Sequence, residues 1–137
     1  MTDLLRLFTR THKVLRARTD QAMSRYGVRA GQNLMLEALW ENDGRTPGEL
    51  AERLGVATPT VVKSASRMEA AGLLTRQRDP KDGRLVRLYL TDQSRAVRHD
   101  IEREVHDLAE RATATLTAEE RRNLATALSK ILAALEK

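Results

Sequence analysis

Cysteine is absent from the 137-residue sequence. Its absence excludes thiol-based redox sensing, thiolate metal sites, cysteine nucleophiles and the disulfides that staple small secreted domains. Aromatic residues make up only 3% of the chain, so it lacks the stacking platform of proteins that bind RNA or single-stranded DNA. Glycine-rich phosphate loops, His-Glu metal motifs and Gly-x-Ser-x-Gly elbows are missing too. We therefore expect neither an enzyme nor a bound cofactor.

Long apolar runs are also missing. Asp3, Arg6 and Arg10 interrupt the N-terminal region, and no apolar run approaches the roughly 20 residues that cross a bilayer. We therefore expect a cytoplasmic protein that makes no membrane contact. The length is that of a single domain, residues 1–137.

Residues 46–72 have the pattern of two short helices joined by a tight turn. Thr46 is placed to cap the first helix, and Glu49 is placed to complete a capping box with it. Gly55 supplies the backbone freedom that the chain reversal needs. Thr58 is placed to cap the second helix. The pattern predicts a helix-turn-helix, whose second helix can enter the major groove of DNA.

The two faces of the second helix differ in character. Val61, Ala65 and Met68 recur at helical spacing and are expected in the core. The opposite face carries hydroxyls and cations but no carboxylate, which favours contact with DNA over simple solvation. We predict DNA contacts from Thr58, Thr60, Lys63, Ser64 and Arg67.

Two strand-like runs, residues 73–78 and 85–90, flank a charged loop that contains Pro80 and Gly83. They predict a hairpin, or wing, that stands out from the body. From Thr58 to Leu90 seven cations face three anions, so +4 of the chain's net +5 lies in this one stretch. Such charge suits phosphates. Arg78 and Lys81 are equally consistent with phosphate contacts and with solvated charges on the wing.

A set of short motifs runs through this stretch: Leu50-Ala51, Leu54-Gly55-Val56, Thr60-Val61, Arg67-Met68-Glu69, Gly72-Leu73-Leu74, Arg76, Asp79, Asp82-Gly83-Arg84 and Leu90-Thr91. Together they resemble the MarR (multiple antibiotic resistance regulator) family of winged helix-turn-helix repressors. The family's wing reads Asp-x-Arg-Asp-x-Arg, matched here at Asp79, Asp82 and Arg84, with Lys81 in place of the first Arg. The resemblance implies that Arg84 inserts into the minor groove and that Asp82 orients it.

Amphipathic helices are expected on both sides of this lobe. The first covers residues 4–26. After the wing, a long helix is capped by Thr91 and runs to Ala112. A last helix opens with a capping box of Thr117 and Glu120. From Thr91 onward eight cations face nine anions, and a near-neutral amphipathic pair suits a partner subunit better than a duplex. We predict a homodimer whose interface includes Leu5, Phe8, Leu124, Leu128, Ile131 and Leu135.

The predicted fold class is mainly α with a small two-stranded β wing. The DNA-binding lobe would cover residues 28–90, with the wing at 73–90, and the dimerisation helices would cover 1–27 and 91–137. The helix expected over residues 31–42 is apolar around most of its circumference, so we predict that it is the central, buried helix of the lobe. His99, Glu102, His106 and Glu110 share one helical face, but the neighbouring arginines favour an exposed mixed-charge face over a metal site.

The resemblance also implies a small phenolic or anionic effector held between the dimer helices and the DNA-binding lobe, with His12, Arg16, Met35 and Trp40 as candidate lining residues. The predicted function is that of a sequence-specific regulator that binds double-stranded DNA. In its finer form it is a homodimeric repressor of a palindromic operator, released by the effector. The alternative is a non-specific architectural DNA-binding protein that uses its cations for phosphates alone.

Overall fold

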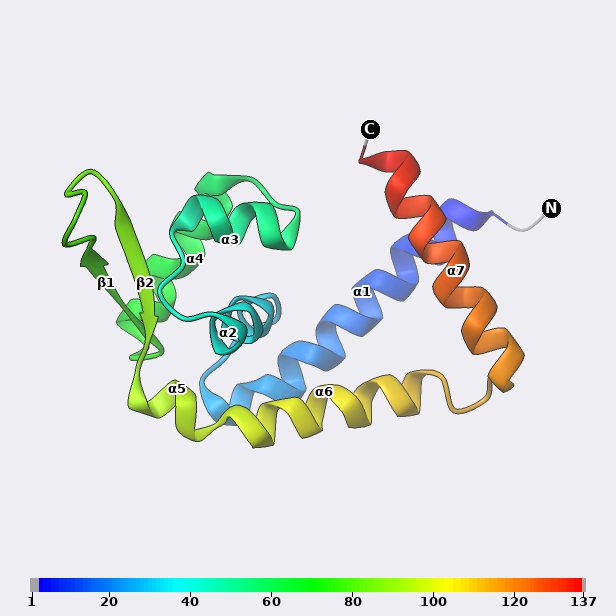
Figure 1. The fold of residues 1–137 in the computed structure, drawn as a ribbon. Coiled ribbons are helices and arrows are strands. Elements are labelled where there is room, and N and C mark those ends of the chain that lie inside the picture. The colour runs from blue at the N-terminus through cyan, green and yellow to red at the C-terminus, as the bar shows by residue number, and fades with distance from the viewer. Residues whose placement is uncertain (1–2, 137) are drawn as a thin grey trace. The chain divides into compact units, whose positions relative to one another are not determined.

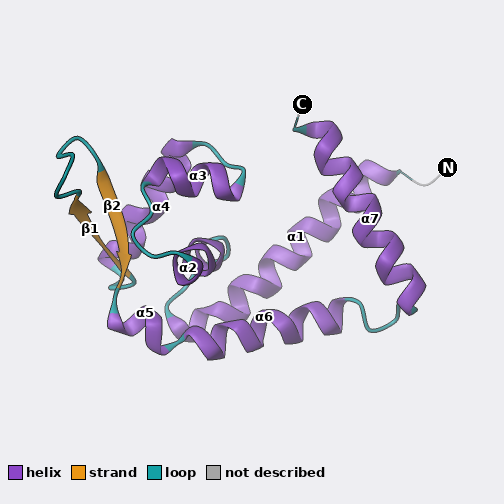
Figure 2. Ribbon diagram, in the orientation of Figure 1, coloured by secondary structure: helices purple, strands orange, loops and turns teal. Residues whose placement is uncertain are grey.

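The computed structural model describes residues 3–136, and the chain divides into two compact units, Met1–Val105 and His106–Lys137. The described residues are helical apart from one hairpin and the connecting loops (Figure 2), which confirms the predicted fold class. The elements, coloured along the chain in Figure 1, are α1 (Leu4–Met23), the 3-10 helix η1 (Ser24–Tyr26), α2 (Gln32–Glu41), α3 (Pro47–Leu54), α4 (Thr58–Ala70), β1 (Leu74–Arg78), β2 (Val86–Leu90), α5 (Asp92–Ala96), α6 (Arg98–Ala112) and α7 (Ala118–Leu135).

Helix α3 begins as predicted at the Thr46 cap. The Thr46 hydroxyl accepts a hydrogen bond from the Glu49 backbone N–H at 3.1 Å. The second half of the predicted capping box is wrong, because the Glu49 carboxylate turns to Arg87, at 3.6 Å. Gly55 ends the helix in the left-handed conformation, at φ 68°, which provides the predicted tight turn into α4.

Helix α4 starts one residue earlier than predicted. Ala57 has the extended conformation of an N-cap, so Thr58 is already the first helical residue and caps nothing. At the other end Gly72 has φ 78°, and the Leu73 N–H reaches back to the Met68 carbonyl at 2.9 Å. This closure turns the chain directly into β1.

The wing is an antiparallel pair in which Leu74 lies opposite Leu90 and Arg78 lies opposite Val86. Its base is extended by a short third segment. Leu88 accepts a hydrogen bond from the Gly44 N–H at 3.0 Å and donates to the Arg45 carbonyl at 2.9 Å. The base of the wing is therefore tied to the loop that leads into α3.

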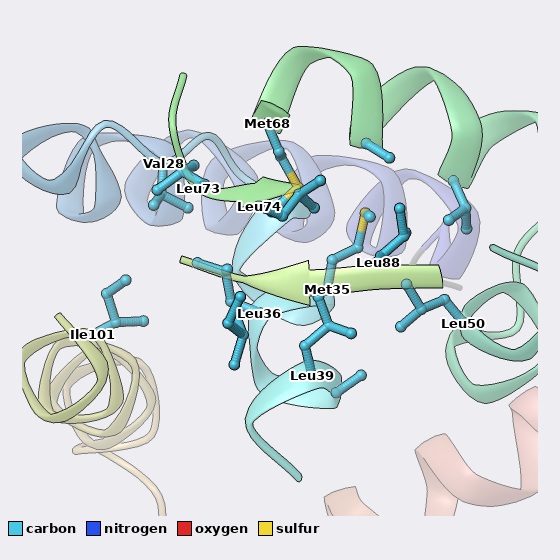
Figure 3. Packing of buried hydrophobic residues seen from close by; sticks show 14 of the residues in the cluster. Val28, Met35, Leu36, Leu39, Leu50, Met68, Leu73, Leu74, Leu88 and Ile101 are labelled. Carbon is cyan, nitrogen blue, oxygen red and sulfur yellow. The ribbon is translucent and has the colours of Figure 1, made fainter. Parts of the chain in front are cut away.

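The core of the first unit is built around α2, as the sequence predicts. Figure 3 shows Met35, Leu36 and Leu39 of α2 among buried side chains of α3, α4, the hairpin and α6. Each fully buried Leu or Met contributes about 1.5–3 kcal/mol through removal of apolar surface from water. Leu34 is the apolar residue of α2 that departs from this burial, since it is 49% exposed.

The predicted single helix from Thr91 to Ala112 is interrupted at Val97. Thr91 does cap its start, through a capping box with Ser94. A continuous helix would use the Ser94 carbonyl for the backbone N–H four residues on. Here the Trp40 indole N–H donates to that carbonyl, at 3.3 Å. The contact from α2 accompanies the break between α5 and α6.

In the second unit, α7 opens with the predicted capping box. The Glu120 N–H donates to the Thr117 hydroxyl at 3.1 Å, and the Thr117 N–H donates to the Glu120 carboxylate at 2.9 Å. Among residues 3–136, no helix has both the length and the apolar character that crossing a bilayer requires.

Candidate nucleic-acid interface

Helix α4 presents the polar face that the sequence predicts. Val61, Ala65 and Met68 are buried and hold the helix on the core. The predicted contact residues on the other side are exposed, apart from the half-buried Ser64: Thr58, Thr60, Lys63 and Arg67. The first turn contains no acidic residue, so the positive end of the helix dipole is not offset there.

The wing loop is shaped by carboxylates that accept backbone hydrogen bonds. Asp79 accepts from the N–H groups of Lys81 and Asp82, at 2.7 and 3.0 Å. Asp82 accepts from the backbone N–H and from Nε and Nη2 of Arg84, at 3.1, 3.1 and 3.2 Å. The Arg84 side chain is 91% exposed although it is bound to Asp82. The loop thus holds out a cation whose orientation is constrained.

These contacts lower the pKa of both wing carboxyls. The pKa of Asp79 lies below its usual value mainly because the Arg87 guanidinium donates to it, with the Lys81 and Asp82 N–H groups adding to the effect. The pKa of Asp82 is lowered chiefly by the hydrogen bond from the Arg84 side chain. Both groups are therefore ionised at neutral pH.

The remaining predicted wing cations, Arg78 at the end of β1 and Lys81 in the loop, are exposed. Within residues 3–136, no carboxylate lies within 4.0 Å of the charged nitrogens of Lys63, Arg67, Arg78 or Lys81. Charge that has no acidic neighbour is available to phosphates.

Asp79, known from the sequence only as part of the wing motif, and Arg87, which was not among the predicted site residues, hold the wing. Asp79 had a detectable signal, because an Asp followed by Pro, Lys and Asp is typical of a turn closed by its own side chain. Arg87 had none, since a cation on the outer face of a strand is usually solvated. In the structure its side chain is only 29% exposed and lies on Asp79.

Two of the four residues predicted for an effector site, Arg16 and Trp40, line different cavities. Arg16 lines a cavity of about 680 Å³ together with other residues of α1, residues of the 27–31 loop, Gln32 at the start of α2, and residues of α4 and its C-terminal end. Trp40 lines a smaller one of about 310 Å³, beside Arg95 and Arg98. Met35 is a core residue, 3% exposed, and His12 is exposed on α1.

The 680 Å³ cavity is rich in cations. Lys13 and Arg16 come from α1, Arg29 from the loop and Arg67 from α4. Asp20 is its acidic residue, and it accepts from the Arg29 Nε and the Ala30 N–H, both at 2.9 Å. The Ala30 N–H is the main cause of the lowered pKa of Asp20, followed by Arg29. The other three cations leave the cavity suited to an anion.

The residues predicted for the dimer interface are large apolar side chains left exposed. On α1, Leu5 and Phe8 are 73% and 43% exposed. On α7 the same holds for Leu124, Leu128, Ile131 and Leu135. Across residues 3–136, no set of three or more His, Asp or Glu side chains is placed to hold a metal ion, and Glu102 of the predicted mixed-charge face pairs with Arg98 at 2.8 Å.

Known proteins resemble this chain in sequence and fold. A model of the MarR family matches residues 26–85. The transcriptional regulator TtmR of Methylorubrum extorquens (strain PA1) is 33% identical over 93 residues, which cover 68% of this chain and 47% of TtmR. The chain thus aligns with about half the length of that relative. The regulator MgrA of Staphylococcus aureus is 26% identical over 130 residues, which cover 95% of this chain and 87% of MgrA.

A solved structure extends the match to nearly the whole fold. The crystal structure of a MarR mutant from E. coli complexed with operator DNA superposes with a TM-score of 0.85 at 27% identity, covering 94% of this chain and 93% of that one. With the exposed, acid-free face of α4 and the arginine-bearing wing, these matches define the protein's class. The chain belongs to the MarR family of winged helix-turn-helix, DNA-binding transcriptional regulators.

Proposed function

We propose that this regulator binds a two-fold symmetric operator as a homodimer, represses transcription there, and is released by a small organic anion. The observation that carries the proposal is the shared exposure of two elements on one lobe. The α4 face is cationic and free of acids, and Arg84 projects from the neighbouring wing. A helix of this kind fits the major groove, and a slender cationic loop fits the adjacent minor groove.

In the proposed complex, α4 reads base edges through Lys63 and Arg67. Thr58, Thr60 and Ser64 bind phosphates or bases near the start of the helix, where backbone N–H groups also favour an anion. On the wing, Arg84 enters the minor groove, held by Asp82, while Arg78 and Lys81 meet the phosphates. Lys81 can act there as a point charge but cannot make the bidentate contact of an arginine.

The dimer part of the proposal rests on apolar exposure. We assign residues 28–90 to the DNA-binding lobe and residues 1–27 and 91–137 to dimerisation. Most of the exposed large apolar side chains lie on α1 and α7, including Leu5, Phe8, Leu128 and Ile131. Large apolar side chains exposed along a helix are typical of an interaction surface, and a second copy of the chain is the cover that we propose. Two-fold symmetry then implies a palindromic operator.

The effector part rests on the 680 Å³ cavity. Its volume lies in the range of sites for small molecules, and Lys13, Arg16 and Arg67 favour a carboxylate or a phenolate. We therefore centre the proposed site on Arg16 rather than on His12, Met35 or Trp40. Arg67 and Ser64 belong both to the cavity wall and to the DNA-facing helix. An anion bound to Arg67 would oppose its contact with DNA, and linkage makes that opposition mutual.

Selection of duplexes from a random DNA pool tests this function directly. The purified full chain should enrich a two-fold symmetric motif whose half-site centres lie about 10 base pairs apart, or a multiple of that spacing. Affinity for the motif and for a scrambled duplex is then followed against salt concentration. If no motif is enriched while affinity falls steeply with salt, the protein is a non-specific architectural binder instead.

A further inference from the structure

Arg87 joins the wing to the helix-turn-helix. It lies on β2, and its side chain is 29% exposed. Its Nη1 donates to the Gly44 carbonyl at 2.9 Å and lies 3.6 Å from a carboxylate oxygen of Glu49, in the first turn of α3. Its Nε donates to the Asp79 carboxylate at 2.5 Å. One guanidinium therefore contacts the loop before α3, α3 itself and the start of the wing loop.

Asp79 carries these contacts into the wing loop. One of its carboxylate oxygens binds Arg87, while the other accepts from the Lys81 and Asp82 N–H groups. Only 12% of the Asp79 side chain is exposed. The backbone at Asp82 is therefore held by a carboxylate that Arg87 fixes to the body.

The next link is the pair that presents the cation to DNA. Asp82 binds the backbone and the guanidinium of Arg84. Hydrogen bonds thus run without a gap from the Gly44 carbonyl through Arg87, Asp79 and Asp82 to Arg84. We propose that Arg87 is a positioning residue for operator binding, which fixes the direction in which Arg84 projects. The inference rests on the proposed minor-groove role of Arg84.

Direct contact between Arg87 and phosphate is the competing explanation, and the geometry disfavours it. Nε and Nη1 are already engaged, and most of the side chain is covered. Arg87 instead strengthens operator binding by preorganisation. A wing loop that is already ordered in the free protein loses little conformational entropy when it binds DNA. Removing the Arg87 guanidinium should weaken operator binding by about tenfold, which matches the free-energy cost of immobilising one or two side chains on binding.

A double-mutant cycle between Arg87 and Arg84 tests the proposal. Arg87→Met keeps most of the aliphatic packing and removes the donors. Operator affinity is measured for wild type, Arg87→Met, Arg84→Ala and the double variant, with thermal melting and dimer mass as checks on folding. Asp79→Asn is a second route to the same break should Arg87→Met fold poorly. Arg76→Met is the matched control. Arg76 of β1 pairs with Glu69 of α4 at 3.0 Å and takes no part in the chain of hydrogen bonds from Gly44 to Arg84.

The expected result is a loss of about tenfold for Arg87→Met that falls below about twofold when Arg84 is already alanine. Hydrogen exchange without DNA should quicken at the Lys81 and Asp82 amides in Arg87→Met and not in Arg76→Met. The salt dependence of binding should be unchanged, since no phosphate contact is lost.

Three results would overturn the inference but not the proposed function. The first two are losses that simply add, and an Arg87→Met variant that binds as wild type while Arg84→Ala does not. A shallower salt slope in Arg87→Met would assign Arg87 to phosphate and also overturn it. If Arg84→Ala itself binds as tightly as wild type, the proposed role of the wing fails and the inference fails with it.

Discussion

Arg16 of α1 and Arg67 of α4 line the same cavity, one on a helix proposed for dimerisation and the other on the helix proposed to read DNA. An anion that binds both guanidinium groups would couple the two parts of the molecule. Its effect on DNA affinity equals the ratio of its affinities for the free and the DNA-bound protein. Separate substitutions of the two arginines distinguish a role in effector binding from a role in DNA binding.

We predict that Arg16→Ala keeps operator affinity in the absence of effector and loses the response to it. Benzoate, as a small aromatic carboxylate, is a suitable first probe, and fluorescence anisotropy of labelled operator follows both properties. Arg67→Ala should instead weaken operator binding itself. If Arg67 reads a guanine, the cost is about 1–3 kcal/mol and is confined to one base pair. An Arg16→Ala variant that still responds like wild type to an active anion would place the effector site elsewhere.

The helix-turn-helix was predictable because its signals are local. The Thr46 hydroxyl, the left-handed Gly55 and the buried spacing of Val61, Ala65 and Met68 each depend on neighbours within a few residues. The paired strands of the wing follow from alternation and turn residues in the same way. Local chemistry and the global fold agree here, as they do in sequences that fold reliably.

Features set by distant contacts were not predictable. The break at Val97 accompanies an indole hydrogen bond from Trp40, and no Gly or Pro marks it in the sequence. Met35, a predicted effector residue, lies in the core. Because α2 is apolar on several sides, its pattern cannot separate such a core residue from one that lines a cavity. Arg87 gave no signal because a cation on the outer face of a strand is usually solvated, and because one of the groups that hold it, the Gly44 carbonyl, is 43 residues away.

The apolar stripe of α7 leads to a second prediction. Leu128→Glu should disrupt the proposed homodimer, because it would place a charge in the centre of an interface that must exclude water. Light scattering with size-exclusion chromatography should show the mass of one chain, and operator affinity should fall with the loss of the second half-site. Lys130→Glu, an exposed position on the same helix, is the control and should remain dimeric. Dimeric Leu128→Glu protein would move the interface away from this stripe.

Gly44 supports the base of the wing in a way that a side chain would prevent. Its φ is +80°, and a Cβ would lie 2.8 Å from Cε1 of the Tyr89 ring. We predict that Gly44→Ala lowers the free energy of unfolding by about 1–2 kcal/mol through backbone strain, and that the clash with Tyr89 adds to this loss. Urea denaturation measures the total. Adding Tyr89→Ala should relieve the clash but not the strain, so the second substitution should cost less in the Gly44→Ala protein than in wild type. If Tyr89→Ala lowers the free energy of unfolding equally in the two backgrounds, the clash does not contribute.

The Asp79–Arg87 pair should make the wing sensitive to acid. The pKa of Asp79 is lower in the folded protein than in the unfolded chain, mainly because of the hydrogen bond from Arg87. Its contribution to stability is therefore complete above the unfolded value of about 3.9 and is lost as the pH falls through the lower folded value. We predict that wild type melts at a higher temperature than Asp79→Asn at pH 6, and that the difference shrinks between about pH 4 and pH 2. In an Arg87→Met background the same Asp-to-Asn comparison should depend less on pH. A difference that keeps its size down to pH 2, or that is unaffected by Arg87→Met, would show that the ionised pair does not stabilise the wing.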